Sequence, residues 1–424
     1  MKINALKGVQ DILPEQISQW NYLHDLAQEI FSCYGYKQII IPIIEESALF
    51  TRSIGQQTDI VEKEMYSFVD RGMRNISLRP EATASVVRAY LEHALDKEGY
   101  SKLFYSGPMF RGEKPQAGRN RQFYQIGIEA LGSYNPLLDA EVIKLAVDYL
   151  KAIGLKDFKL LINSVGTTKD KHDFGSALKI FLQDKQDSLC DSCKARYERN
   201  VLRILDCKSR NCKKVLQDAP IILDNLSEES KHDFARLKSG LDELNVEYQV
   251  MPYLVRGLDY YTKTVFEITH DKLGAQNTIL AGGRYDNLIS DLGGQPAGAV
   301  GFACGVERLM LAANADLVKF PETNKPAVFV IGLGSKAHSK AFAIADQLRQ
   351  QRIVTYIDFQ DRSLKAQMRQ ANKLDCAYVL ILGEDELKNN NIQLKNMRQG
   401  TQQLLCLDSL AEHVKTIILK HSAT

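Results

Sequence analysis

Two apolar segments, each next to an arginine-containing string, constrain the fold of this chain most. Residues 265–268 (VFEI) and 278–280 (TIL) have the composition of β-strands, and a polar turn region separates them. The string RGLDYY precedes the first segment at 256–261, and AGGRYD follows the second at 281–286. Each string places an arginine beside glycine or small residues and aromatic hydroxyls. The pattern predicts paired strands that present cations and hydrogen-bonding rings to a small polar ligand.

Regular strand geometry does not bring all of these side chains to one ligand. A strict pleat would put Arg256 and Tyr261 on opposite faces. The segment must therefore bend if both side chains contact one substrate, and Gly257 permits the bend. A surface hairpin with a salt-bridged arginine is the alternative interpretation of the same residues.

The bulk composition excludes several classes of protein. The 424 residues, 45% hydrophobic and 25% charged, suffice for two or three globular domains. There is no apolar run of about eighteen residues, and the first residues lack the apolar core of a secretory signal. Cys33, Cys304, Cys376 and Cys406 are scattered in apolar segments, which suits a reducing compartment. We therefore expect a cytoplasmic protein without a membrane partner.

The net charge of +2 is unevenly distributed. Residues 325–424 hold 14 Lys and Arg against 9 Asp and Glu. Residues 194–214 form a second basic region, in which only Glu198 and Asp206 are acidic. Two basic regions on an otherwise slightly acidic chain favour two contacts with one polyanion. Solvated charged faces are the alternative interpretation.

The N-terminal part predicts a helix followed by a strand. Apolar residues recur with helical spacing from Ile17 to Tyr34, and Gly35 ends the pattern. The run at 39–44 (IIIPII) predicts a buried strand, in which Pro42 favours an edge or a bulge. An edge strand needs cover from another element or another chain.

The segment 103–131 predicts a strand, a polar loop and a second strand. Arginines, beginning with Arg111, crowd the loop, which suits a polyphosphate and the end of an RNA strand. On the second strand Phe123, Gln125 and Glu129 share one face, and apolar residues share the other. A buried Gln or Glu without partners is costly, so a ligand pocket accounts for this face better than an ordinary core strand.

Two further segments suit anion binding at a helix start. Residues 79–81 (RPE) open a predicted helix that runs to about Leu95, with Glu81 near its positive end. Residues 301–309 (GFACGVERL) predict a strand entering a helix, with Arg308 in the first turn, where a helix attracts anions. Alone, Arg308 could equally be a solvated residue at a helix start.

Together these segments resemble the histidyl-tRNA synthetase family of class II aminoacyl-tRNA synthetases. The strings at 256–261 and 281–286 resemble its paired histidine-specific signatures. Three further parts resemble the three class II motifs in order: the N-terminal helix and strand, the segment 103–131, and the segment 301–309. Similar strings at 58–66 and 78–83 extend the resemblance over nearly the whole chain.

The resemblance implies an α+β fold with two domains. A class II catalytic domain with an antiparallel-sheet core would span 1–322 and carry a mainly helical insertion at about 166–243. A linker at 323–326 would lead to a small α/β anticodon-binding domain at 327–424. The first motif forms the dimer interface in this family, so a homodimer is implied, although an ordinary core strand fits the sequence alone.

The resemblance also implies a role for each candidate side chain. The substrates would be L-histidine, ATP with Mg²⁺, and tRNA-His. Arg111 and Arg256 would be catalytic, and Arg256 would take a task that metal performs in relatives. The ATP-binding residues would be Arg111 on the α-phosphate, Phe123 on adenine, Glu113 at the adenine end and Arg308 on the terminal phosphate. The histidine-binding residues would be Glu81, Thr83 and Gln125 at the α-amino group, and Glu129 and Tyr261, with Tyr260 alongside, at the imidazole.

Four cysteines are not needed for synthetase chemistry. They form two close pairs, Cys190 with Cys193 and Cys207 with Cys212, separated by thirteen residues. Four thiolates in this pattern could hold tetrahedral zinc in a small ribbon. Reduced cysteines in the core of the insertion are the alternative, because the second pair is loosely spaced and the family does not require the metal.

Other functions remain open at this level. A synthetase for another amino acid would share the class motifs, although the strings at 256–261 and 281–286 favour histidine. A non-catalytic paralogue, such as the regulatory subunit of ATP phosphoribosyltransferase, should lack the complete set of Arg111, Arg256 and Arg308 and the C-terminal domain. A stress-sensing tRNA-binding module would keep the fold without the chemistry.

Overall fold

The computed structural model describes residues 3–56, 58–116, 118–274, 277–321 and 327–422. The linker expected at 323–326 lies outside the described residues. Residue contacts divide the chain into two units, Met1–Pro321 and Glu322–Thr424, and each unit is described by itself.

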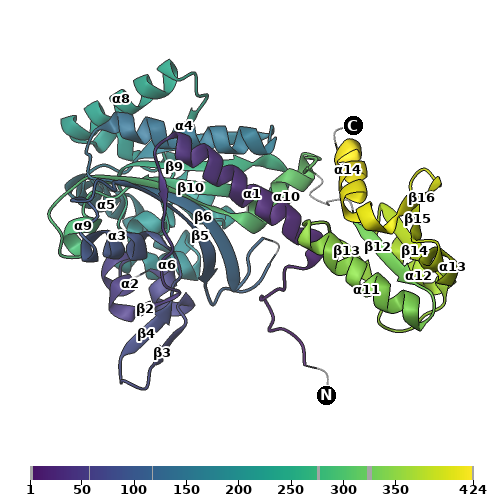
Figure 1. Cartoon of the computed structure of the whole chain (residues 1–424). Helices are drawn as coiled ribbons and strands as arrows, with labels where there is room; N and C mark the ends of the chain where they lie inside the picture. Colours follow the sequence, from purple (N-terminus) through teal and green to yellow (C-terminus); the bar gives the residue numbers. More distant parts are fainter. Residues whose placement is uncertain (1–2, 57, 117, 275–276, 322–326, 423–424) are drawn as a thin grey trace. The chain divides into compact units, whose positions relative to one another are not determined.

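In the described part of the first unit, an eight-stranded sheet forms the centre (Figure 1). In spatial order its strands are β1 (Lys37–Gln38), β5 (Lys102–Phe110), β6 (Gln122–Leu131), β11 (Ala299–Gly305), β10 (Thr278–Arg284), β9 (Thr262–His270), β7 (Phe158–Ser164) and β8 (Gln249–Val250). Neighbours from β5 to β7 are antiparallel, whereas β1 and β8 pair in parallel at the edges. The strands predicted at 265–268 and 278–280 are confirmed as β9 and β10.

Long helices cover one face of this sheet, and Figure 1 shows three of them side by side over the strands: α1 (Pro14–Cys33), α4 (Pro136–Ile153) and α8 (Glu228–Glu243). The apolar face of α10 (Val306–Ala315) joins the same core. The sequence sets the bounds of α4 locally. Its first residue is a proline, the Asn135 side chain accepts a hydrogen bond from the Leu137 N–H, and Gly154 ends it with a φ of 99°.

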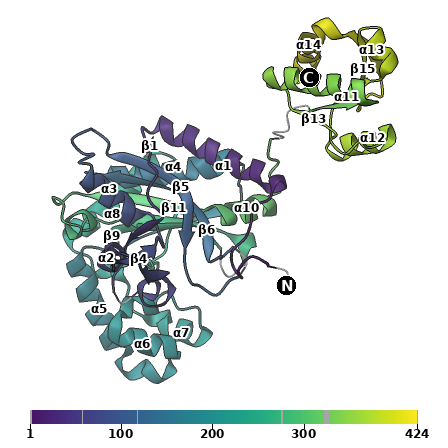
Figure 2. The same cartoon turned by 60° about the horizontal axis from the view of Figure 1, so that its bottom comes forward.

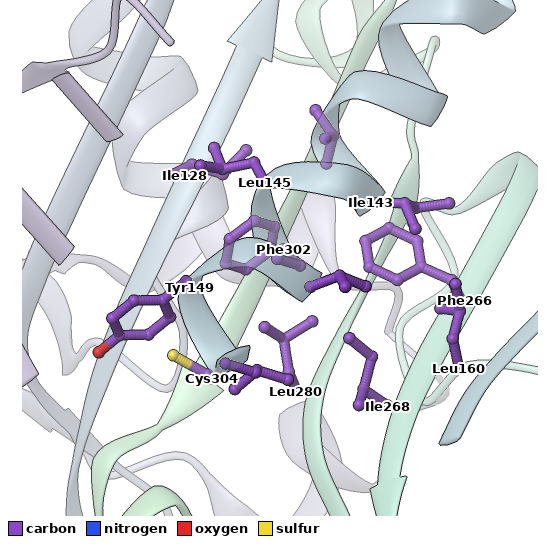
Figure 3. Close-up of a cluster of buried hydrophobic side chains, with 14 of the residues drawn as sticks. Ile128, Ile143, Leu145, Tyr149, Leu160, Phe266, Ile268, Leu280, Phe302 and Cys304 are labelled. Carbon is purple, nitrogen blue, oxygen red and sulfur yellow. The ribbon is translucent and has the colours of Figure 1, made fainter. Parts of the chain in front are cut away.

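Figure 3 shows the core between α4 and the sheet. Ile143 and Tyr149 of α4 pack on Phe266 of β9 and Phe302 of β11, and these side chains are almost fully buried. Burial of one such aromatic side chain stabilises the fold by about 2–3 kcal/mol. This face of the sheet is therefore closed, and any ligand must approach the opposite face.

The opposite face carries a second apolar core and a small antiparallel sheet. Side chains alternate along the strands, so that Phe104 of β5 lies in the first core while Leu103 and Tyr105 lie in the second. The elements on this side are β2 (Ile44–Glu46), β3 (Ser67–Val69), β4 (Asn75–Leu78), α2 (Ser47–Ser53), the short π-helix η1 (Ile60–Glu64), α3 (Thr83–Glu92) and α9 (Leu288–Asp291). The 3-10 turn η6 (Asp271–Leu273) instead lies against α10 and the first core.

The segment 166–243 is mainly helical, and Figure 2 shows its helices α5, α6 and α7 grouped together. Its last helix, α8, differs from the others because Phe234 and Leu237 belong to the first core and Gly240 lies against Ala140 of α4. The preceding helices are α5 (Thr168–Leu182), η2 (Gln183–Ser188), α6 (Asp191–Arg199), η3 (Val201–Ile204), α7 (Arg210–Val215), η4 (Leu216–Asp218) and η5 (Ile222–Asn225).

The prediction of one buried strand at 39–44 is wrong. Strand β1 ends at Gln38 and β2 begins only at Ile44. Between them the carbonyls of Ile41 and Pro42 accept hydrogen bonds from the buried Arg79 guanidinium, at 2.6 and 3.2 Å, instead of pairing with a strand. Ile40 is 87% exposed and Ile44 is 50% exposed. An apolar run exposed on a single chain is typical of an interaction surface.

The second unit is a small α/β fold, as the sequence predicts. Its sheet has the order β13 (Thr355–Ile357), β12 (Val328–Gly332), β14 (Tyr378–Leu382), β15 (Asn391–Asn396) and β16 (Gln402–Cys406), parallel over the first three strands and antiparallel afterwards. The helices are α11 (Ser335–Gln350), α12 (Leu364–Lys373), α13 (Glu384–Lys388), the 3-10 turn η7 (Leu407–Ser409) and α14 (Leu410–Ser422). Among the described residues of both units, no helix is long and apolar enough to cross a membrane.

Candidate active site

The side chains that the sequence singles out for ATP and histidine all line one cavity of about 700 Å³ on the open face of the sheet. The alternation of the strands explains this. On β6, Ile126 and Ile128 point into the closed core, while Gln125 and Glu129 point into the cavity, as predicted. The predicted residues that line the cavity are Glu81, Thr83, Arg111, Glu113, Phe123, Gln125, Glu129, Arg256, Tyr260, Tyr261 and Arg308.

A buried carboxyl group, Glu129, organises one part of the cavity. Its Oε1 atom accepts a hydrogen bond from the Thr83 hydroxyl at 2.8 Å, and its Oε2 atom accepts one from the Tyr285 hydroxyl. Glycine at 301 keeps this place open, because a side chain there would collide with the carboxyl group. Burial raises the pKa of Glu129 to about 8, although the hydrogen bonds from Tyr285 and Thr83 oppose the rise. The ligand-free site therefore holds a proton near neutral pH.

Glu81 lies beside this group at the start of α3. Its carboxylate accepts hydrogen bonds from the backbone N–H groups of Thr83 at 2.7 Å and Ala84 at 3.0 Å, which are free at the helix start. The helix begins only at Thr83, so Glu81 precedes it instead of opening it as predicted. Burial raises the pKa of Glu81 above its ordinary value, while the backbone donors oppose the rise. The two buried carboxyl groups share Thr83, which bonds Glu129 through its hydroxyl and Glu81 through its N–H.

Aromatic rings form the adjoining wall. Residues 251–261 lie outside the strands, so the bend inferred at Gly257 is present and Arg256, Tyr260 and Tyr261 reach the same cavity. The ring centroids of Tyr260 and Tyr261 are 4.8 Å apart, and those of Tyr260 and Tyr285 are 5.6 Å apart. Packing of this kind fixes the hydroxyl groups in place.

Gln125 supplies an acceptor for a ligand. Its Oε1 atom is buried and has no hydrogen-bond partner among the described residues. A buried acceptor without a partner is costly, and a bound ligand with an N–H group would satisfy it.

Among the described residues, six arginines line the cavity, and three of them, Arg111, Arg256 and Arg308, are those that the sequence singles out. The Nε atom of Arg111 donates to the Pro80 carbonyl at 2.9 Å, and its guanidinium carbon lies 5.3 Å from the centroid of the Phe123 ring. Arg256 pairs with Glu267 at 3.0 Å. Arg308, in the first turn of α10, donates to the carbonyls of Gly118 at 3.2 Å and Thr278 at 2.7 Å. These contacts fix three cations around the cavity before any ligand enters.

Two acidic residues position the arginine-rich loop between β5 and β6 (residues 111–121, the cation loop) and the strand β6 that follows it. Glu113 accepts a hydrogen bond from Arg119 at 3.0 Å and lies 3.9 Å from Arg111. Both carboxylate oxygens of Glu307 accept from the Tyr124 N–H at 3.1 Å, which ties α10 to β6. Burial raises the pKa of Glu307 to about 7. Sequence reasoning did not single out Glu307, because only the fold brings it to Tyr124.

The string AGGRYD at 281–286 contributes Tyr285 to the cavity, whereas its arginine, Arg284, does not line the cavity. The interpretation that both strings present an arginine to the ligand is wrong for Arg284, which is 1% exposed and pairs with the buried Asp139 of α4. It also donates to the Ser133 carbonyl at 2.8 Å and to Asp286 at 2.9 Å. Arg284 therefore anchors β10 to α4, and the next residue, Tyr285, reaches Glu129. Sequence reasoning did not assign Tyr285 to the site.

Two sequence comparisons cover the chain. A family profile described as histidyl-tRNA synthetase matches residues 8–309, and one described as anticodon binding domain matches residues 327–417. The histidine–tRNA ligase of Halothermothrix orenii is 46% identical over 99% of this chain and 100% of its own length. That of Syntrophotalea carbinolica is 45% identical over 97% and 98%. The chain belongs to the histidyl-tRNA synthetase family.

Solved structures agree with this membership. The apo histidyl-tRNA synthetase of S. aureus is 36% identical and superposes with a TM-score of 0.81 over 97% of this chain and 99% of its own. A Bacillus halodurans C structure described as an ATP phosphoribosyltransferase regulatory subunit/histidyl-tRNA synthetase shares the fold, with a TM-score of 0.66 at 20% identity over 90% and 99%. As a member of this family, the chain is a class II aminoacyl-tRNA synthetase and a ligase.

Proposed function

We propose that the cavity activates L-histidine with ATP and that the chain transfers the histidyl group to the 3′ end of tRNA-His. The observation that carries the proposal is Glu129, which lies buried with Thr83 and Tyr285 in the cavity that the three predicted arginines and three others also line. A buried, hydrogen-bonded carboxyl group suits the ring N–H of an imidazole, and guanidinium groups suit a triphosphate. Full-length similarity to histidine–tRNA ligases supports the same substrates.

Histidine recognition is assigned to two groups of side chains. Glu129 and Tyr261 contact the imidazole nitrogens, with Tyr260 packed alongside. Glu81, Thr83 and Gln125 hold the α-amino group, and the unpaired Oε1 of Gln125, within the described residues, supports this role because an ammonium group can donate to it. A site with several buried polar atoms rejects analogues that leave those atoms unpaired.

ATP recognition is assigned to the cation loop and α10. Arg111 holds the α-phosphate, Phe123 stacks on adenine, Glu113 contacts the adenine end and Arg308 holds the terminal phosphate. The carbonyls that accept from the Nε atoms of Arg111 and Arg308 support these roles, because they fix each guanidinium before the reaction. Mg²⁺ would accompany ATP, and the carboxylate of Glu64, which lines the cavity, would offer it a hard oxygen ligand.

The reaction needs positioned charge more than it needs a base. The histidine carboxylate oxygen attacks the α-phosphorus, a new P–O bond forms, and the bond to the β-phosphate breaks so that pyrophosphate leaves. Negative charge grows on the α-phosphoryl oxygens, and Arg111 and Arg256 stabilise it. A terminal ribose hydroxyl of the tRNA then attacks the histidyl carbonyl. The ester C–O bond forms, the bond from the carbonyl to the phosphate oxygen breaks so that AMP leaves, and the hydroxyl proton is released.

The remaining parts are assigned to tRNA binding and assembly. The catalytic domain is placed at 1–322 with an insertion at about 166–243 that approaches the acceptor stem, and the basic domain at 327–424 binds the anticodon. The exposed apolar residues Ile40, Ile43 and Ile44 support a homodimer. Because tRNA charging serves translation, the proposed location is the cytoplasm.

A charging assay tests the proposal against the regulatory-subunit alternative. The full chain is incubated with total tRNA, ATP and radiolabelled histidine, and the acid-precipitable label is counted. Charging of tRNA-His that needs ATP supports the proposal. A chain that binds histidine but never charges tRNA would be a non-catalytic paralogue, and the proposal would be wrong.

A further inference from the structure

Four cysteine sulfurs of the insertion converge at one point. The Sγ atoms of Cys190, Cys193, Cys207 and Cys212 all lie within 4.8 Å of one another, and all four cysteines are free. They come from separate parts of the chain: Cys190 precedes α6, Cys193 lies in its first turn, Cys207 follows η3 and Cys212 lies within α7. Packing of apolar surface alone does not require four sulfurs to share one centre.

The separations match a tetrahedral metal centre. Zinc binds thiolate sulfur at about 2.3 Å, and a regular tetrahedron of that radius separates its sulfurs by about 3.8 Å. The Sγ atoms of Cys190 and Cys207 are 3.8 Å apart. The remaining pairs fall within the 4.8 Å limit, so small side-chain rotations would complete the centre.

The surroundings suit the charge of such a centre. Zinc with four thiolates carries two negative charges, which hydrogen-bond donors and nearby cations stabilise. The Cys190 N–H donates to the sulfur of Cys212 at 3.3 Å, and the Ser209 N–H donates to that of Cys207 at 3.5 Å. The sequence around the cluster is strongly basic: Lys194, Arg196, Lys208, Arg210, Lys213 and Lys214.

The lobe around the cluster is built from short elements. Between α5 and α8 it consists of two short α-helices and four 3-10 turns, and its buried apolar side chains join the second core: Leu189, Val201, Ile204, Leu216, Ile222 and Leu226. A metal centre would add a cross-link to these short elements, as metals and disulfides do in small scaffolds. Cys193 and Cys212 are fully buried, whereas Cys190 and Cys207 are only partly buried, so the centre is closed on one side.

We propose that Cys190, Cys193, Cys207 and Cys212 bind one structural zinc ion. Four protein ligands fill the tetrahedral coordination and leave no place for water or substrate, which excludes a catalytic role for the metal. The ion ties α6 and α7 and the turn between them, so binding stabilises the folded lobe.

The centre also bears on the active site, because the elements it ties contact the catalytic elements. Arg196 of α6 pairs with Asp59 at 3.1 Å, and Asn200 donates to Asp259 at 2.9 Å. Arg203 of η3 donates to the backbone carbonyl of Arg256 at 3.4 Å. Loss of the metal would therefore loosen one wall of the cavity as well as the lobe.

Metal analysis of the full chain tests the proposal. The wild type, expressed with zinc and dialysed, should retain about one zinc ion per chain, as measured by inductively coupled plasma mass spectrometry. Replacement of zinc by cobalt should give the intense visible absorption of a tetrahedral thiolate complex. Cys193→Ser and Cys212→Ser should retain less than about 0.1 zinc per chain. The exposed Cys33→Ser, outside the cluster, is the matched control and should retain the wild-type amount.

Hydrogen exchange gives a second readout that does not depend on the variants folding. Chelation of zinc from the wild type should speed amide exchange in residues 189–216 at least about 10-fold, and added zinc should reverse the change. A folded wild type without zinc, a chain that carries iron in its place, or Cys212→Ser with full zinc would overturn the proposal.

Discussion

Replacement of Glu129 by glutamine should stabilise the ligand-free chain above neutral pH while it abolishes most of the activity. Burial holds the pKa of Glu129 at about 8, against an ordinary value of 4.5, and the hydrogen bonds from Tyr285 and Thr83 offset only part of the effect. The side chain is 1% exposed, so its ionisation lowers the free energy of unfolding, because a buried charge loses its hydration. Glutamine has nearly the same shape and cannot ionise.

The magnitude follows from proton linkage. Between pH 4.5 and pH 8 the folded chain holds a proton that the unfolded chain has released. The stability that this proton gives is complete below about pH 4.5 and is lost as the pH rises through about 8. Each pH unit in that window corresponds to about 1.4 kcal/mol, so the loss from pH 5.5 to pH 8.5 is about 3 kcal/mol. E129Q escapes this loss.

The assay is urea denaturation followed by the fluorescence of Trp20, the single tryptophan of the chain. Its ring lies 5.0 Å from that of Tyr124, on the strand that carries Glu129, so it reports the catalytic unit. The free energy of unfolding of E129Q relative to the wild type should rise by about 3 kcal/mol between pH 5.5 and pH 8.5. Its kcat/KM for histidine activation should fall at least about 100-fold.

The surface variant E247Q is the matched control, because Glu247 is exposed and lies outside the cavity. Its stability difference from the wild type should be the same at both pH values. If E129Q behaves like this control, Glu129 is ionised without penalty in the folded chain, and the reasoning from burial is refuted.

Three further predictions concern the cations and the domains. Arg256→Ala should slow adenylate formation in single-turnover kinetics by about 100-fold or more, with a smaller effect on histidine KM; near-native activation would make Arg256 a structural residue. A chain ending at Pro321 should still form adenylate but charge tRNA poorly, and its RNA affinity should depend less steeply on salt. If a circular dichroism melt shows that the truncated chain is folded and it charges tRNA as well as the full chain, the C-terminal domain does not bind this tRNA. Asp139→Ala should lower the free energy of unfolding by about 3–5 kcal/mol, because it removes the main partner of the buried Arg284. The preference for histidine should stay unchanged. A loss below about 1 kcal/mol, measured by Trp20 fluorescence, would show that the fold does not need the pair.

Local periodicity explains what could be predicted. Because side chains alternate with a two-residue period in a strand, the sequence predicts that Gln125 and Glu129 share one face. The structure shows that this face lines the cavity. The start of α10 followed from the strand-to-helix pattern around Arg308. Such signals depend on neighbours in sequence, so one chain suffices to detect them.

Long-range pairs explain what could not be predicted. Tyr285 and Glu129 are 156 residues apart, and Arg284 and Asp139 are 145 apart, so only the sheet and α4 bring these partners together. The prediction of a buried strand at 39–44 is wrong for another reason. Hydrophobicity predicts removal from water, but it does not distinguish the core of one chain from a surface that another molecule covers.

Exchange of labelled pyrophosphate into ATP, measured with each of the twenty amino acids in turn, shows which amino acid the cavity activates. The buried acceptors around Glu129 and Tyr261 predict exchange with histidine at a rate about 10⁴-fold or more above that with any other amino acid. Equal exchange with another amino acid, or none with histidine, would contradict the account of this cavity.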